Sequence, residues 1–136
     1  MIIEVDENPN DRDIQKLRSH LLQFNLNHLD VKSRPPIAIW CKDKAQTITA
    51  GIAGDTFGNW LEIHFLWVQE ELRKSGTGKK LLLKMEEIAK IRGCLYVKVD
   101  IYDFQAKSFY EKNGYKVIFS LSDYPFSGEK HYLTKN

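Results

Sequence analysis

Four cations and two glycines are crowded into residues 73–80, whose order is Arg-Lys-Ser-Gly-Thr-Gly-Lys-Lys. The segment lies between an apolar, strand-like stretch at residues 63–68 and an amphipathic, helix-like stretch from Leu81 onward. A strand that turns through glycines into a helix start leaves backbone N–H groups unpaired, and the helix dipole adds partial positive charge there. Such a corner binds phosphate. The alternative is a solvated basic helix start.

The order of residues in this corner excludes two common phosphate-binding motifs. A P-loop needs a hydroxyl residue where Lys80 stands and a first glycine where Arg73 stands. A dinucleotide-binding fingerprint needs a third glycine at the position of Leu81. What remains is Arg-x-x-Gly-x-Gly, which resembles the cofactor signature of the GNAT family of N-acetyltransferases. In that family this turn grips the pyrophosphate of acetyl-CoA.

A second segment is similar to the same family. Residues 106–115 read Ala-Lys-Ser-Phe-Tyr-Glu-Lys-Asn-Gly-Tyr, close to the family's Ala-x-x-x-Tyr-Glu-Lys-x-Gly-Phe/Tyr. Two ordered motifs are more specific than one, and the similarity covers residues 60–115. The resemblance implies an α/β fold with a mixed, mostly antiparallel sheet flanked by helices, in which the parallel fourth and fifth strands splay apart. It also implies an enzyme, an N-acetyltransferase with acetyl-CoA as its cofactor.

The hydrophobic pattern predicts the elements that this fold requires. Six strands are expected, at residues 37–41, 47–53, 60–68, 95–101, 115–120 and 130–134. Residues 54–59 are expected to form a turn within an antiparallel meander. Helices are expected after a cap at Asn10 or Asp11, from Leu81 to Gly93, and from Asp103 to Gly114. A helix crosses over between the strands at 60–68 and 95–101, which correspond to the family's fourth and fifth strands. Those two strands are therefore predicted to be parallel.

Composition sets the broad class of the protein. At 136 residues and 43% hydrophobic content, the chain suits a single domain over residues 1–136. A net charge of +2 does not argue for a nucleic-acid partner. No apolar stretch approaches the roughly 20 residues that span a bilayer, so we expect no membrane partner and a cytoplasmic location. Cys41 and Cys94 lack C-x-x-C spacing and are expected to be buried free thiols.

The resemblance places the cofactor along three segments. Pantetheine would lie in the splayed gap like an added strand, paired with the backbone near Leu66, Trp67 and Val68. By the same analogy, the backbone N–H of Val68 would be the oxyanion donor. We expect the Leu66 and Trp67 side chains to be packed. The expected cofactor contacts are Leu66, Trp67, Val68, Arg73, Lys74, Ser75, Gly76, Thr77, Gly78, Lys79, Asp103, Gln105 and Tyr110. Many relatives have asparagine at the position of Asp103, and since a carboxylate cannot donate an amide proton, Gln105 is the alternative contact there.

Three residues are candidates for catalytic proton transfer. Tyr110 matches the family's tyrosine. Its phenol, with an ordinary pKa of about 10, could protonate the thiolate of coenzyme A, whose thiol resembles that of cysteine with a pKa of about 8.5. Glu62 lies six positions before Val68, the offset at which some relatives carry a glutamate base. His64 lies on the same nominal face and is able to titrate near neutrality. A strand bulge could move either side chain to the other face. The spacing of the histidines does not call for a metal.

The acceptor is expected to be a primary amine, attracted by acidic and aromatic side chains near the cleft. The aromatic candidates are Trp60, Tyr102, Tyr124 and Phe126. Protein amino termini, lysines, polyamines, aminoglycosides and small metabolites all stay open. We expect direct attack in a ternary complex, by a monomer or homodimer. The alternative is a noncatalytic acyl-CoA-binding or sensory domain that kept the phosphate corner and lost turnover.

Overall fold

The computed structural model describes residues 1–136, which divide into two compact units, Met1–Lys32 and Ser33–Asn136. The first unit holds helix α1 (Asp11–Leu26). This helix begins as predicted, because Asn10 is its N-cap and the Asn10 side-chain oxygen accepts a hydrogen bond of 2.9 Å from the Asp13 N–H. It also ends well before the two prolines at 35 and 36.

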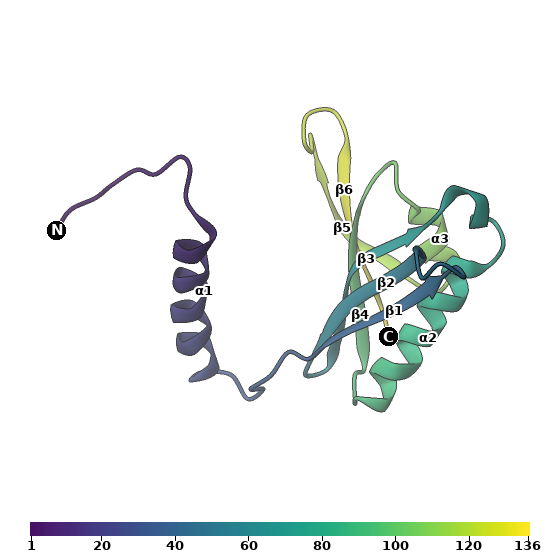
Figure 1. Ribbon diagram of the computed structural model, residues 1–136, viewed down its shortest axis with the longest axis horizontal. Coiled ribbons are helices and arrows are strands. Elements are labelled where there is room, and N and C mark those ends of the chain that lie inside the picture. The colour runs from purple at the N-terminus through teal and green to yellow at the C-terminus, as the bar shows by residue number, and fades with distance from the viewer. The chain divides into compact units, whose positions relative to one another are not determined.

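The second unit is built on one six-stranded sheet with the order β1-β2-β3-β4-β6-β5 (Figure 1). Its strands are β1 (Pro36–Lys42), β2 (Ile48–Phe57), β3 (Trp60–Val68), β4 (Tyr96–Tyr102), β5 (Lys116–Ser122) and β6 (Glu129–Lys135). The first three form the predicted antiparallel meander, and β4 runs parallel to β3. The closing hairpin places β6, not β5, beside β4. The predicted fold class is therefore confirmed.

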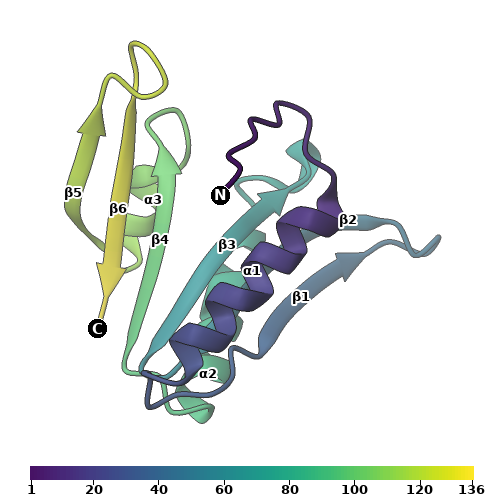
Figure 2. The ribbon, with the colours of Figure 1, turned by 90° about the vertical axis from the view of Figure 1, so that its left-hand side faces the viewer.

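Helices α2 (Thr77–Ile91) and α3 (Lys107–Lys112) lie on the same face of this sheet (Figures 1 and 2). Helix α2 covers the core with four buried residues on one face, namely Leu81, Leu82, Met85 and Ala89. The sheet contributes the other half of the core, including Ile52, Leu61 and Leu133. A single 3-10 turn, Glu70–Leu72, links β3 to the loop before α2. None of the helices has the length and apolar character that crossing a bilayer requires.

Strand β2 is longer than predicted. The expected turn at residues 54–59 is wrong over its first four residues, which continue the strand, and only Gly58 and Asn59 connect β2 to β3. Gly54 serves close approach of two backbones here, because a Cβ at this position would collide with the Glu62 carbonyl oxygen. Gly54, which the sequence places in a turn, thus lies inside the sheet where the backbones of β2 and β3 come close together.

Opposite Gly54, strand β3 carries one extra residue. Ala53 pairs with Phe65 and Gly54 pairs with Ile63, so His64 has no partner of its own on β2. The sequence left open a bulge that would move Glu62 or His64 to the other face, but the bulge present leaves both on the face they share. It reverses which residues of β3 face the core from this point onward.

Strands β3 and β4 pair over a short length only. The parallel pairing runs from Trp60 opposite Tyr96 to Ile63 opposite Val99. Both strands continue beyond that point without pairing to each other, and Figure 2 shows them diverging. The predicted splay of the two parallel strands is therefore present.

Candidate active site

The gap between the splayed strands opens into a cleft of about 1060 Å³. Its walls come from the end of β3, the loop and first turn of α2, the end of β4, and α3. The predicted site residues that line it are His64, Leu66, Trp67, Val68, Arg73, Lys74, Gly76, Gly78, Lys79, Gln105 and Tyr110. The fold thus brings the strand end, the glycine corner and the second motif into one cavity.

The backbone at the end of β3 presents groups to this cleft that are not paired with another strand. The Gln69 N–H donates to the Thr49 carbonyl oxygen on β2 at 2.9 Å. Because the backbone groups of successive strand residues point to opposite sides, those of Leu66 and Val68 face the gap, whereas those of Trp67 face β2. The Val68 N–H is therefore directed toward the space where a cofactor would lie.

The side chains at the end of β3 follow the bulge. Ile63 faces the core before the bulge, and Leu66 and Val68 pack against the core after it. Uninterrupted alternation from Ile63 would have placed Phe65 and then Trp67 in the core. Instead Trp67 is 51% exposed on the opposite face, so the prediction of a packed Trp67 side chain is wrong, while Leu66 packs as expected.

The start of α2 has the features of an anion site. Gly76 is the N-cap with φ +86°, a conformation that glycine adopts without strain, and no side chain caps the helix. The first helical hydrogen bond is donated by Lys80 to the Gly76 carbonyl. The N–H groups of Thr77, Gly78 and Lys79 are thus left without helical acceptors.

Side chains around this corner divide into two groups. The cations that line the cleft are Arg73, Lys74, Lys79 and Lys112. Arg73 is also tied to the strand end, since its Nε donates to the Val68 carbonyl at 2.8 Å. Ser75 and Thr77 do not line the cleft, and their hydroxyls bond to each other at 2.8 Å. Lys112 was not among the predicted site residues, because it reads as an ordinary exposed helix residue.

Tyr110 lies buried at the side of the cleft, with its ring edge-on to Phe109 and Tyr115 at 5.2 and 5.3 Å between centroids. Burial raises the pKa of Tyr110 to about 12. Complete proton transfer to a thiolate of pKa about 8.5 would then cost about 5 kcal/mol. The arrangement therefore favours hydrogen-bond donation to sulfur as negative charge develops, rather than full transfer.

The structure separates the two residues expected to contact pantetheine after β4. Asp103 does not begin a helix, since α3 starts at Lys107, and its carboxylate accepts the Glu129 N–H at 3.2 Å. Asp103 does not line the cleft, whereas Gln105 does. The Gln105 Oε1 accepts the Tyr102 N–H at 2.7 Å, which leaves the amide N–H groups as donors toward the cleft.

None of the four aromatic residues proposed for acceptor binding lines the cleft. Trp60 is at the far end of β3, where it packs on Tyr96 with ring centroids 4.9 Å apart. Phe126 is in the loop between β5 and β6 and is 90% exposed. Strand direction explains the first result, because Trp60 begins the strand whose other end borders the cleft.

The other two aromatic residues already hold a cation. Lys130 Nζ lies 4.5 Å from the Tyr102 ring centroid and 5.3 Å from that of Tyr124, and it pairs with Asp100 at 3.0 Å. The hydrogen bond to Asp100 raises the pKa of Lys130. The expected ammonium-binding wall is thus occupied by the protein's own ammonium group.

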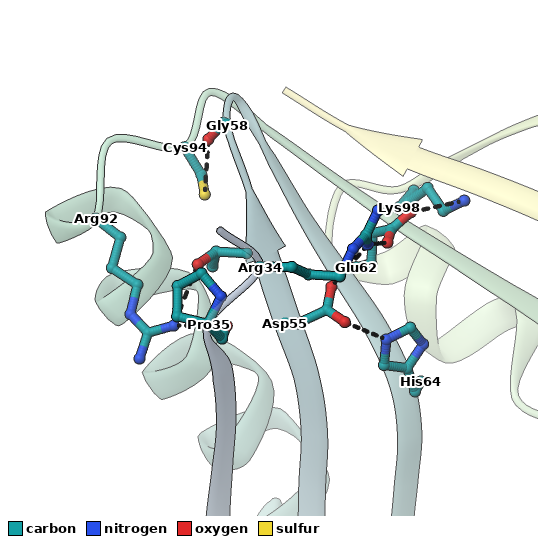
Figure 3. Close-up of polar contacts among 10 residues, drawn as sticks. Arg34, Pro35, Asp55, Gly58, Glu62, His64, Arg92, Cys94 and Lys98 are labelled. Carbon is teal, nitrogen blue, oxygen red and sulfur yellow. Dashed lines mark hydrogen bonds and ion pairs between the residues drawn. The ribbon is translucent and has the colours of Figure 1, made fainter. Parts of the chain in front are cut away.

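The two candidate bases have different surroundings (Figure 3). Glu62 accepts from Lys98 at 3.0 Å through one oxygen and from Arg34 through the other, and it does not line the cleft. His64 lines the cleft, and its Nε2 lies 3.0 Å from Asp55 Oδ2. The other Asp55 oxygen accepts from Arg34 at 3.1 Å. Sequence reasoning missed Asp55 because it fell inside the predicted turn.

Asp55, Glu62 and His64 bring one ligand atom each within 4.8 Å of one another, a donor set that a metal ion could use. The two carboxylates, however, are already neutralised by Arg34 and Lys98. The charges of the cluster therefore balance without a metal ion.

The sheet, the splayed gap and the corner at α2 define the class of acetyltransferases that the two motifs predict. The model of the Acetyltransferase (GNAT) family matches residues 3–115. Blasticidin-S acetyltransferase of Streptomyces morookaense is 33% identical over 96 residues, 70% of each chain. Acetyltransferase Atu2258 of Agrobacterium fabrum is 31% identical over 105 residues, 77% of each chain. The chain therefore belongs to the GNAT family of acetyltransferases.

A solved structure agrees with this assignment over nearly the whole chain. The crystal structure of an acetyltransferase from Bacillus cereus superposes with a TM-score of 0.84 at 30% identity and covers 97% of this chain and 96% of its own. The predicted family and enzyme class are confirmed, and with the family comes acetyl-CoA as the cosubstrate.

Proposed function

We propose that the protein transfers the acetyl group of acetyl-CoA directly to a primary amine within a ternary complex. The observation that carries the proposal is the end of strand pairing beyond Ile63 and Val99, which leaves the backbone groups of Leu66 and Val68 facing a cleft. An extended pantetheine arm can pair with such groups as an added strand does. Its pyrophosphate would then reach the uncapped start of α2.

Each chemical requirement of the transfer has a candidate group in the cleft. The Val68 N–H faces the gap and would stabilise the developing oxyanion, and the neutral Tyr110 hydroxyl would bond to the departing sulfur. A covalent acetyl-cysteine route has no support, because neither Cys41 nor Cys94 lines the cleft. Burial also raises the pKa of Cys94, which makes its thiolate less available.

The acceptor we propose to test first is blasticidin S, because a relative at 33% identity is a blasticidin-S acetyltransferase. The other amines kept from the sequence analysis form the comparison panel: spermidine, kanamycin, a lysine-containing peptide and free amino acids. A primary amine that supports thiol release with saturation kinetics would identify the acceptor class.

The experiment that tests the proposal is calorimetric titration of the protein with acetyl-CoA, followed by thiol release against the amine panel. Gly78→Leu is the informative variant, because a side chain at Gly78 would point toward Phe109 and Val68 across the cleft. A Cβ at Gly76 would meet nothing within 4 Å, so bulk there blocks less. Lys80→Leu is the matched control, since Lys80 is on the same helical turn but outside the cleft. Folded protein that binds no acetyl-CoA would refute the proposal.

We also propose that the protein works in the cytoplasm, as a monomer or homodimer, with residues 1–136 forming one domain. The two free cysteines support a reducing compartment. Light scattering of the purified protein would decide between one copy and two.

A further inference from the structure

We propose that His64 is the general base that deprotonates the acceptor amine and that Asp55 is its positioning residue. This inference rests on the proposed function and names the base that the sequence left open. The bond between His64 Nε2 and Asp55 Oδ2, at 3.0 Å, assigns the ring proton to Nε2 (Figure 3). The lone pair is then on Nδ1, the nitrogen that Asp55 does not hold.

Position separates His64 from its rival. His64 lines the cofactor cleft and its side chain is 46% exposed, so an acceptor can reach it. Glu62 is 18% exposed, lies outside that cleft, and gives one oxygen to Lys98 and the other to Arg34. Both carboxylate oxygens of Glu62 are thus engaged by cations, and neither is left open to an acceptor amine.

His64 lies at the bulge in β3, on the face of the sheet that carries Asp55 and Glu62 (Figure 3). The extra residue lets both His64 and the following Phe65 be exposed, instead of alternating between the two faces of the sheet. Gly54 permits the bulge because it leaves room for the Glu62 carbonyl. Strand alternation accounts for the face that His64 shares with Glu62 and Asp55, and the bulge changes the face only from Phe65 onward.

Charges around the dyad balance when the imidazole is neutral. Arg34 precedes β1, Asp55 is on β2, Glu62 is on β3 and Lys98 is on β4, which gives two positive and two negative groups. Asp100 of β4 borders the same cleft but is paired with Lys130. When His64 accepts a proton, the adjacent Asp55 carboxylate stabilises the imidazolium, as in other carboxylate–histidine pairs.

This arrangement accounts for both protons that the acceptor nitrogen loses during the reaction. The acceptor enters as an ammonium ion, and Nδ1 of His64 takes one proton, which frees the nitrogen lone pair. The lone pair forms the C–N bond to the thioester carbonyl carbon, and the C–S bond then breaks. The second proton lost by nitrogen neutralises the coenzyme A thiolate with Tyr110 as hydrogen-bond donor, and His64 releases its proton to water.

The test measures kcat and KM for His64→Ala, Asp55→Asn, Asp55→Glu and Glu62→Gln, with acetyl-CoA and the amine from the panel that the wild-type protein acetylates. We expect His64→Ala to lose about 100-fold in kcat at pH 7, the low end for general-base catalysis. Asp55→Asn should lose about 10-fold or more, the rate equivalent of one hydrogen bond to a charged group, with partial recovery in Asp55→Glu. Glu62→Gln should lose less than either.

Two readouts separate catalysis from a structural role. Added imidazole should restore part of the His64→Ala rate, because the site is open to solvent. The His64→Ala deficit should also shrink as pH rises toward the pKa of the amine, about 10 for an alkylamine, where no base is needed. Calorimetry should show unchanged acetyl-CoA affinity in every variant.

Three results would overturn the inference. One is a His64→Ala rate near that of wild type, and another is a deficit that neither imidazole nor high pH relieves. The third is loss of wild-type activity in EDTA with recovery on adding Zn²⁺, which would make the cluster a metal site. Wild-type protein that binds acetyl-CoA but acetylates no amine would instead refute the proposed function, and this inference with it.

Discussion

Charged side chains on the two sides of the splayed gap differ in whether they form ion pairs within the protein. On the cofactor side, Arg73, Lys74, Lys79 and Lys112 line the cleft, and none of them forms an ion pair within the protein. On the opposite face of the sheet, Asp55 pairs with Arg34, and Glu62 pairs with both Arg34 and Lys98. Cations without ion-pair partners indicate a surface that binds an anionic ligand. Carboxylates that are paired with cations indicate a structural cluster, which here holds His64 in position.

The largest expected effect is on the unpaired side. Gly78→Leu places a side chain between Phe109 and Val68, where the cofactor must pass, and we expect acetyl-CoA affinity to fall by about 100-fold or more. Stability should not fall, because leucine is a better helix former than glycine. Calorimetry and thermal unfolding measure the two quantities. Normal affinity in this variant would mean that the cofactor does not use this corner.

The next effect concerns Tyr110, which lies where the cofactor side meets the reacting atoms. Tyr110→Phe should lower kcat by about 10- to 100-fold, because the departing sulfur loses its hydrogen-bond donor. The affinity for acetyl-CoA should stay unchanged. Tyr102→Phe is the matched control, since Tyr102 is on β4 but does not line the cleft. Equal losses in the two variants would remove Tyr110 from the mechanism.

The pH dependence of this step follows from the raised pKa of about 12 for Tyr110. A raised pKa keeps the phenol protonated to higher pH, so the donor is fully present below about pH 10 and is lost only as pH rises through about 12. We therefore expect no alkaline fall of kcat between pH 8 and 10 that depends on Tyr110. A fall in that range that vanishes in Tyr110→Phe would contradict the burial argument.

On the paired side, Arg34→Gln should reduce stability instead of cofactor affinity. The change leaves Asp55 and Glu62 close together with Lys98 as their remaining cation. Because Arg34 is 43% exposed, screening by solvent keeps the loss to about 1 kcal/mol, below the roughly 3–5 kcal/mol of a fully buried pair. Thermal unfolding should report a midpoint lower by a few degrees. A drop in acetyl-CoA affinity would mean that the two sides are coupled.

The same contrast explains what the sequence could predict. The cofactor side is built from two contiguous motifs, so Arg73, Gly76, Gly78 and Tyr110 could be named from residue order alone. The paired side gathers residues from four separate segments, and no spacing rule joins Arg34 to them. The position of the bulge at His64 was also not fixed by residue order, and this bulge changes the face of each later residue in β3. Strand periodicity therefore fails for Trp67, although it succeeds for most of the sheet.

The smallest predicted effect is the sharpest test of the contrast, because it compares neighbours of the same type. Lys79 lines the cleft and Lys80 does not, although both are exposed at the start of α2. Lys79→Gln should weaken acetyl-CoA binding by about fivefold, the worth of one solvent-exposed charge near an anion at a helix start. Lys80→Gln should change the affinity far less, and neither should alter stability by more than about 0.5 kcal/mol. Raising the salt concentration should narrow the difference, because screening weakens exposed charges. Equal effects from the two lysines would mean that the helix start attracts the cofactor only through its general positive field, and that the cleft does not fix where the phosphates lie.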